Sequence, residues 1–360
     1  MAWQPLVTGA DAEPFREVLV EILAADNPDR TLDALADRAV VAAYTETGDP
    51  AAEMAVLVEQ LDGVNRLALF GGAARIGWTL AHLADGVAVE MACDSIDRVL
   101  TSELLVEQPY DLISGLVGLG VYALERGKSG TPTVERIIEA LRARAVPRHG
   151  GLAWPDDRWN LGLAHGVPGV IAMSARACAA GVRGARDLLD GAAAYLAATA
   201  TAPHPSREAD ATRERVAWCY GDLGIATALL GAGIWVDDDD LRARGRSLAL
   251  RCAELGLANV GVRDTTLCHG AAGNAHVFNR MAQATGDPVL ADAARAWLGH
   301  ALVLRTSDPI AGFGHRLDDG DTEPAGTLIF GAPGVGLIVH AAITDQEPSW
   351  DRLFLMDLPV

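Results

Sequence analysis

The sequence predicts an all-α protein in which repeated helix pairs close into an α/α toroid, within a single domain spanning residues 1–360. Two observations predict this fold. A Gly-x-x-Gly pattern followed by an apolar run recurs along the chain. No stretch alternates apolar and polar residues with the β-branched side chains typical of strands. Recurrence of one pattern at regular intervals indicates stacked supersecondary units.

The glycine motif occurs in five clear copies and one imperfect copy. The clear copies begin at Gly115, Gly166, Gly221, Gly270 and Gly331. The imperfect copy begins at Gly72 and has Arg75 in place of its second glycine. The interval between successive copies accommodates two helices of average length and their turns. We therefore expect each motif to begin an inner helix of the toroid.

The segments around the motifs alternate between amphipathic and apolar character. Residues 133–141 place their apolar side chains on one helical face, as an outer helix would. Residues 224–230 are apolar on every side, as expected for an inner helix that is buried all round. Asp49 and Asp287, each followed by proline, are predicted helix N-caps. Closing the ring buries the inner helices without special caps, which favours a toroid over an open solenoid.

Composition and charge exclude several classes of protein. The net charge of -19 argues against a nucleic-acid surface, which needs basic patches. Pro324 to Thr344 carries no Asp, Glu, Lys or Arg and is long enough for a bilayer, but Pro333, His340 and the glycine repeat favour a buried helix. Membrane contact is expected to be peripheral at most. Five cysteines and the absence of an apolar signal in residues 1–14 predict a reduced, cytoplasmic setting.

Two glycine motifs carry metal-binding side chains at matching positions. Cys219 lies two residues before Gly221, Cys268 lies two residues before Gly270, and His269 follows Cys268. If the motifs begin inner helices at one end of the toroid, equal offsets face a common mouth. Two thiolates and one imidazole suit Zn²⁺ and leave a fourth tetrahedral position open, as in catalytic zinc sites.

Four other polar side chains lie close to the same motifs: His165, Asp111, Arg215 and Tyr220. Each also has an ordinary structural alternative. His165 could be a satisfied helix-start histidine, and Asp111 could be the N-cap of a helix over residues 112–124. Arg215 could bond loop carbonyls, and Tyr220 could serve packing alone.

The remaining cysteines and histidines have no register argument. Cys93, Cys178 and Cys252 are expected to fill the core. The histidines left without an assignment are His149, His204, His276, His300, His315 and His340.

At these motifs the sequence resembles the lanthipeptide cyclase, or lanthionine synthetase C-like, family. The matching stretches are residues 111–120, 160–169, 218–221 and 268–270, in the family's order. The resemblance implies a toroid of about seven inner and seven outer helices. Because only six copies of the motif are visible, the seventh pair is expected in degenerate N- or C-terminal sequence.

The resemblance also implies a reaction and a set of roles. The reaction is addition of a peptide cysteine thiolate to dehydroalanine or dehydrobutyrine, which forms (methyl)lanthionine thioether rings. The implied partners are a dehydrated precursor peptide and a separate dehydratase, since the chain has no room for a fused one. The implied zinc ligands are Cys219, Cys268 and His269, and the implied catalytic residues are His165, Asp111, Arg215 and Tyr220.

Other functions stay open beside this one. A relative that adds glutathione or another small thiol to dehydrated residues would use the same zinc site. A non-catalytic toroid could bind a modified peptide without turnover. An α/α-barrel glycosidase or terpene-type cyclase would need paired carboxylates or Asp-rich motifs at the mouth, and the acidic run of residues 237–240 is expected at the opposite end.

Overall fold

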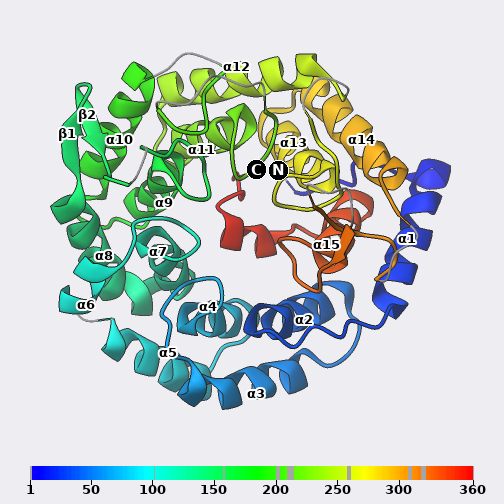
Figure 1. Ribbon diagram of the computed structural model, residues 1–360, viewed down its shortest axis with the longest axis horizontal. Helices are drawn as coiled ribbons and strands as arrows, with labels where there is room; N and C mark the ends of the chain where they lie inside the picture. Colours follow the sequence, from blue (N-terminus) through cyan, green and yellow to red (C-terminus); the bar gives the residue numbers. More distant parts are fainter. Residues whose placement is uncertain are drawn as a thin grey trace.

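The helices form two concentric rings, as Figure 1 shows. The computed structural model describes residues 2–100, 102–156, 159–199, 203–208, 215–257, 261–306, 310–317 and 322–359. Within these residues the inner ring consists of α2 (Leu32–Thr45), α4 (Ala73–Leu83), α7 (Leu116–Glu125), α9 (Val167–Ala179), α11 (Asp222–Trp235), α13 (Ala271–Thr285) and α15 (Ala332–Ile343). The outer ring consists of α1 (Glu13–Ala24), α3 (Pro50–Gln60), α5 (Val87–Val99), α8 (Thr131–Arg144), α10 (Ala185–Thr199), α12 (Asp239–Leu255) and α14 (Pro288–Val303). A short helix, α6 (Ser102–Glu107), packs beside α8.

The ring is closed, which confirms the predicted toroid. Each inner helix packs against the next, and the last of them, α15, packs against the first, α2. The seventh pair comes from the N-terminal sequence: α1 is the outer partner of α15, while α2 is an inner helix without a glycine motif. A side-chain cap replaces the glycine there, because Thr31 Oγ1 accepts a hydrogen bond from Ala34 N at 3.3 Å.

The glycine motifs begin the other six inner helices, as predicted. The first glycine of each copy is the helix N-cap, and the preceding loop folds back over the first turn. A Cβ at Gly118 would collide with the Leu112 carbonyl, and one at Gly273 would collide with the Leu267 carbonyl. Gly221 also has a φ of +106°, which favours glycine. The motif therefore permits a close approach of loop and helix.

Arg75 occupies the place of the second glycine in the imperfect copy, and it helps to close the ring. Its guanidinium is buried and forms an ion pair with Asp37 of α2. The other oxygen of Asp37 accepts a hydrogen bond from Leu328 N at 2.6 Å. Burial raises the pKa of Asp37 to about 7, against the opposing effect of Arg75. This pair joins α2 and α4 to the loop that precedes α15.

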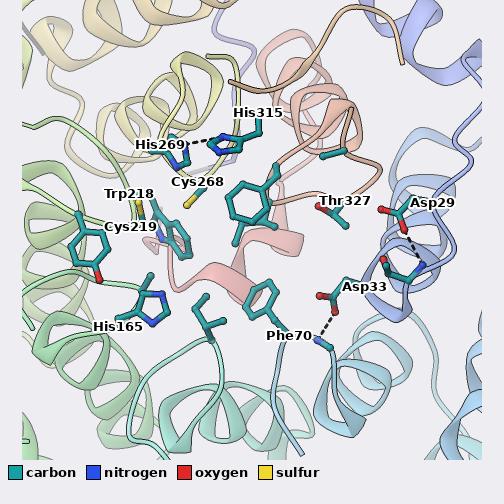
Figure 2. A pocket seen from close by; sticks show the side chains of 18 of the residues that line it. Asp29, Asp33, Phe70, His165, Trp218, Cys219, Cys268, His269, His315 and Thr327 are labelled. Atoms are coloured by element: carbon teal, nitrogen blue, oxygen red, sulfur yellow. Dashed lines mark hydrogen bonds between the residues drawn. The ribbon is translucent and has the colours of Figure 1, made fainter. Parts of the chain in front are cut away.

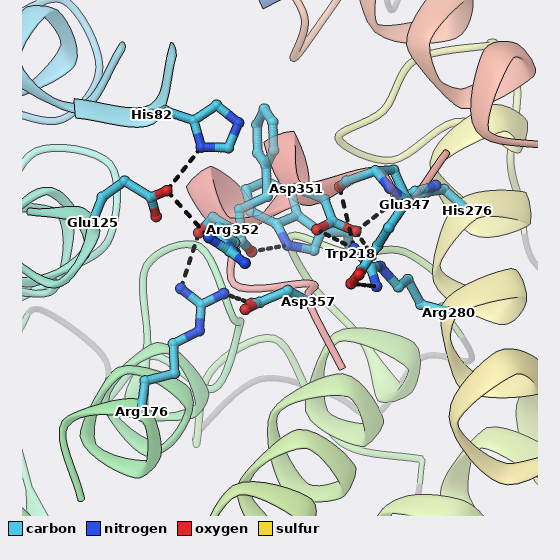
Figure 3. A network of polar contacts seen from close by, with 12 residues as sticks. His82, Glu125, Arg176, Trp218, His276, Arg280, Glu347, Asp351, Arg352 and Asp357 are labelled. Atoms are coloured by element: carbon cyan, nitrogen blue, oxygen red, sulfur yellow. Dashed lines mark hydrogen bonds and ion pairs between the residues drawn. The ribbon is translucent and has the colours of Figure 1, made fainter. Parts of the chain in front are cut away.

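The C-terminal segment fills the inside of the ring, drawn in red in Figure 1. It contains the 3₁₀ helix η4 (Ser349–Phe354), whose Asp351 is fully buried. Asp351 accepts hydrogen bonds from Arg280 Nε at 2.6 Å and from His276 Nε2 at 2.8 Å, both on α13 (Figure 3). The segment thus supplies a hydrogen-bonded floor beneath the mouth of the toroid.

Extended structure within the described residues consists of two short antiparallel hairpins and one isolated bridge between Asn160 and Arg207. One pairs β1 (Val146–Arg148) with β2 (Gly151–Ala153), and the other pairs β3 (Gly314–Arg316) with β4 (Thr322–Pro324). The sequence did not reveal them, because three-residue strands are too short to show an alternating pattern.

Several local predictions can be compared with the helices. Asp49 and Asp287 are side-chain N-caps of α3 and α14, as expected. Asp238, in the acidic run, caps α12. The apolar stretch before Thr344 forms only the twelve-residue α15, and no helix among the described residues has both the length and the apolar character to cross a membrane.

Candidate functional site

The loops ahead of the inner helices are joined around the mouth by backbone hydrogen bonds. Ala164 N donates to Cys219 O at 3.4 Å, Cys219 N donates to Cys268 O at 3.2 Å, and Cys268 N donates to Ile329 O at 3.1 Å. Each of these residues lies two positions before the first glycine of its own motif. Residues at equal offsets in neighbouring repeats are therefore adjacent, which is the arrangement that the register predicted.

A cavity of about 790 Å³ opens at this mouth (Figure 2). All but one of the residues predicted for the site line it: Cys219, Cys268, His269, His165, Arg215 and Tyr220. Asp111 instead lines an adjoining cavity of about 530 Å³, which also borders His165 and Tyr220. The larger cavity has an apolar side that includes Phe70 and Phe330.

The three predicted metal ligands converge at one wall of this cavity. Ligand atoms of Cys219, Cys268 and His269 lie within 4.8 Å of one another. The two cysteines are 5 % and 7 % exposed and lie just ahead of α11 and α13. A hydrogen bond between the two sulfurs lowers the pKa of Cys219 and raises that of Cys268, because the Cys268 thiol donates to the Cys219 thiolate.

The donor set fits a tetrahedral Zn²⁺ ion. Atoms that bind one zinc ion at about 2.0–2.3 Å lie roughly 3.5–4 Å from one another. The ligand atoms of Cys219, Cys268 and His269 lie within 4.8 Å of one another, which is close to that spacing. The two sulfurs are buried and share one proton. A cation that displaced this proton would balance the charge of the two thiolates. Nε2 of His269 is turned toward Asp264 Oδ2 at 3.3 Å, which leaves Nδ1 for the ion.

The electrostatics of His269 depend on that carboxylate. Burial alone would lower the pKa of His269, but the hydrogen bond from its ring to Asp264 and the nearby Cys219 sulfur raise it to about 9. Burial would likewise raise the pKa of Asp264, yet His269 and the Thr266 donors lower it to about 2. His269 and Asp264 therefore stabilise each other's charged forms.

His165 and Asp111 form a second imidazole–carboxylate pair, and His165 lies in the loop next to that of Cys219. His165 Nδ1 lies 2.7 Å from Asp111 Oδ2, and the His165 side chain is 40 % exposed. Asp111 Oδ1 accepts from Ser114 N at 2.7 Å. Burial would raise the pKa of Asp111, but the bonds from His165 and Ser114 lower it. The alternative of an N-cap at Asp111 is wrong, since α7 begins at Leu116 with Gly115 as its cap.

Arg215 and Tyr220 lie next to this histidine. The Arg215 guanidinium lies 5.8 Å from the centroid of the Tyr220 ring, and the Tyr220 and His165 rings stack at 6.1 Å. Asn160 Nδ2 donates to Tyr220 Oη at 2.9 Å. Because that oxygen accepts a hydrogen bond, its own proton remains available for a group in the cavity.

Two residues of the site were not singled out from the sequence: Asp264 and His315. Asp264, His269 and His315 form a second group whose ligand atoms lie within 4.8 Å of one another. Asp264 lies six residues before Gly270, the same offset that Arg215 has before Gly221, so the register could have identified it. His315 lies on the β3 strand, outside the repeat, and carried no such signal.

The other cysteines lie outside this cavity lining. Cys93 and Cys252 are buried, and Cys178 is partly buried. Among the unassigned histidines, His276 belongs to the buried network of Figure 3, and His204 Nδ1 lies 2.9 Å from Asp222 Oδ1 at the start of α11.

Comparisons with known proteins agree with this architecture. A family model described as lanthionine synthetase C-like protein matches residues 25–355. Among solved structures, nisin cyclase is similar in fold, with a TM-score of 0.68 and 17 % sequence identity over 96 % of this chain and 97 % of that chain. A sequence search among curated proteins finds no match. Since the family model covers most of the chain, this protein belongs to the lanthionine synthetase C-like family.

Proposed function

We propose that this protein is a zinc-dependent lanthipeptide cyclase. It adds a cysteine thiol of a dehydrated precursor peptide to a dehydroalanine or dehydrobutyrine of the same peptide, forming (methyl)lanthionine. The main observation in support of the proposal is that Cys219, Cys268 and His269 converge at the cavity that His165 also lines. Membership of the lanthionine synthetase C-like family and the fold shared with nisin cyclase support it.

Cys219, Cys268 and His269 would hold the ion and leave one coordination position toward the cavity. A Zn²⁺ ion held by these residues would lower the pKa of a substrate thiol that is otherwise mostly protonated at neutral pH. Aromatic side chains around the ligands reduce the access of water to that position, with Trp218 and Phe330 on the cavity wall.

His165 is the proton carrier in this proposal. Its Nδ1 is bound to Asp111, so a neutral ring presents Nε2 as the acceptor. Nε2 takes the thiol proton as the sulfur attacks the β-carbon. The π electrons of the alkene pass to the α-carbon and its carbonyl, and the same proton is then returned to the α-carbon. Sulfur and hydrogen add across one double bond, and no other reactant is consumed.

Tyr220 and Arg215 are placed to stabilise the enolate oxygen that develops during this addition. The Tyr220 hydroxyl has its proton available because Asn160 occupies its acceptor side. Arg215 adds a positive charge over the same ring. Donors that are already oriented where charge develops commonly contribute several kcal/mol to transition-state stabilisation, about 3–4 for one oxyanion donor.

The cavity suits a short segment of peptide, since volumes of about 300–1,000 Å³ are usual for bound ligands of that size. The substrate must already contain dehydrated residues, so a separate dehydratase acts before this protein. Free cysteines at the ligand positions are compatible with the reducing cytoplasm, where we place the reaction.

The test compares wild-type protein with Cys268→Ala and with Cys252→Ala, a buried cysteine outside the site. Wild type and C252A should bind about one zinc per chain and close rings in a dehydrated precursor, while C268A should lose both properties. Metal analysis and mass spectrometry after alkylation of unreacted thiols provide the measurements. Complete ring formation without metal would overturn the proposal.

Free glutathione in the same reaction separates the competing functions. A ring-closed peptide of unchanged mass is the expected product. A glutathione adduct would instead indicate addition of small thiols, and tight peptide binding without any product would indicate a non-catalytic toroid.

A further inference from the structure

A buried carboxylate that the proposed reaction does not use contacts both a proposed zinc ligand and the β3–β4 hairpin. Asp264 Oδ2 lies 3.3 Å from His269 Nε2 and 3.2 Å from His315 Nδ1, and it accepts a hydrogen bond from Arg316 N at 3.4 Å. Its other oxygen, Oδ1, accepts from Thr266 N at 3.1 Å and from Thr266 Oγ1 at 2.9 Å. The carboxylate orientation is therefore determined from both sides.

This geometry selects one tautomer of the His269 ring. His269 Nε2 lies 3.3 Å from the acceptor oxygen Asp264 Oδ2 and 3.3 Å from His315 Nδ1, so the carboxylate favours the tautomer with the proton on Nε2. A neutral ring with that proton has its lone pair on Nδ1, the nitrogen that remains for the ion shared with Cys219 and Cys268. A metal-bound histidine whose second nitrogen donates to a carboxylate is held in one orientation and is a stronger ligand.

His315 contacts the same oxygen of Asp264 but does not belong to the group formed by Cys219, Cys268 and His269. Its Nδ1 lies 3.3 Å from His269 Nε2, and its ring lies 5.5 Å from that of Phe330 at the cavity wall. Asp264, His269 and His315 form a group whose ligand atoms are close enough to hold a metal ion. The group that contains Cys219 and Cys268 does not include His315. The hairpin is thus tied to the ligand through one carboxylate.

We propose that Asp264 is the positioning residue of the metal centre: its carboxylate sets the tautomer and orientation of His269 and holds the β3–β4 hairpin against the same ligand through His315. The inference rests on the proposed zinc site and adds to it a residue that acts on the ligand without touching the ion.

Asp264→Asn is the informative change, since Asn retains the oxygen that Thr266 requires. The amide nitrogen then faces His269 Nε2 and donates to it, which favours the proton on Nδ1, the wrong nitrogen for the metal. Zinc affinity, measured by competition with a chromophoric chelator, should fall about 10–100-fold. Asp111→Asn is the matched control, because it alters the other imidazole–carboxylate pair, and it should change the affinity less than about threefold.

His315→Gln separates positioning from direct ligation. It leaves the contact between Asp264 and His269 in place, so zinc affinity should change less than about threefold. A loss as large as that of D264N would mean that Asp264, His269 and His315 themselves hold the ion, which would overturn the proposal. Unchanged affinity in D264N, with normal zinc binding by the wild type, would overturn it as well.

Nitrogen-15 chemical shifts of His269 in zinc-loaded wild-type protein test the tautomer directly, whether or not the variants fold. The expected spectrum has a protonated Nε2 and a metal-bound Nδ1. Metal bound through Nε2 would refute the role of Asp264 alone. A wild-type protein that binds no zinc would refute the proposed function, and the role of Asp264 with it.

Discussion

We predict that the buried ion pair between Asp351 and Arg280 contributes several kcal/mol to the stability of the protein, because it anchors the segment that fills the ring. Asp351→Asn removes the charge opposite an Arg280 side chain that is 0 % exposed. Arg280 would keep Glu347 Oε1 and the Pro348 carbonyl as partners, but not a buried counter-charge. His276 Nε2 would also lose its anionic acceptor.

The expected loss follows from that burial. Removing one partner of a buried ion pair costs about 3–5 kcal/mol, because the other charge stays desolvated. With an unfolding entropy of about 2.1 cal/mol/K per residue over 360 residues, this corresponds to a fall in melting temperature of roughly 4–7 °C. Glu347→Gln is the matched control: it alters a 46 % exposed partner of the same guanidinium and should cost less than about 1 kcal/mol.

The pH dependence of this difference has a definite sign. Burial would raise the pKa of Asp351, but the charge of Arg280 and the hydrogen bond from His276 lower it. A carboxylate with a lowered folded-state pKa contributes its full stability above its unfolded pKa of about 3.9 and loses it as the pH falls through the folded value. The stability gap between wild type and D351N should therefore be constant near neutrality and shrink below about pH 4.

Urea denaturation at several pH values, with calorimetry at neutral pH, measures both effects. Tryptophan fluorescence follows the unfolding, and one of the eight tryptophans, Trp218, donates from Nε1 to Phe354 O at 2.9 Å and thereby links the segment to the loop of Cys219. If D351N proves no less stable than E347Q, the reasoning that this ion pair anchors the C-terminal segment is wrong.

Further predictions concern the proposed catalytic residue His165 and the glycine motif. His165→Asn should slow ring formation by about 10²–10⁴-fold while zinc content stays unchanged, because His165 donates no ligand; rate assays and metal analysis measure this, and zinc loss would contradict it. Gly273→Ala should lower the unfolding free energy by about 1–3 kcal/mol, because the new Cβ collides with the Leu267 carbonyl. Gly299→Ala, at a helical position with nothing within 4 Å, should raise it by about 0.5–1 kcal/mol, and equal effects in urea denaturation would refute the packing argument.

The register of the glycine motifs explains why so much of the candidate site could be predicted from the sequence. Each motif begins a helix at the same end of the ring, and backbone hydrogen bonds join the preceding loops in a fixed order. A side chain two residues before one motif is therefore a neighbour of its counterpart in the next. Cys219 and Cys268 are brought together in this way by repetition alone, without any long-range information.

The contacts that the register of the motifs does not predict involve residues outside the repeat. His315 reaches the site from a hairpin between α14 and α15, and its position depends on where that hairpin folds. The pairing of α1 with α15 joins opposite ends of the chain, and α2 begins with a threonine cap in place of the glycine motif. Neither feature follows from local periodicity.

By itself, the sequence determined the helical class, the start of six inner helices and the nearness of seven candidate side chains to one mouth, because these depend on local propensity and on a spacing that repeats. Only the tertiary structure decided which helices make the seventh pair, how Asp264 joins His269 to His315, and that the C-terminal segment lies inside the ring. Those contacts link residues that are distant in sequence or belong to no repeat. Their energies come from burial and charge pairing, which exist only once the ring has closed.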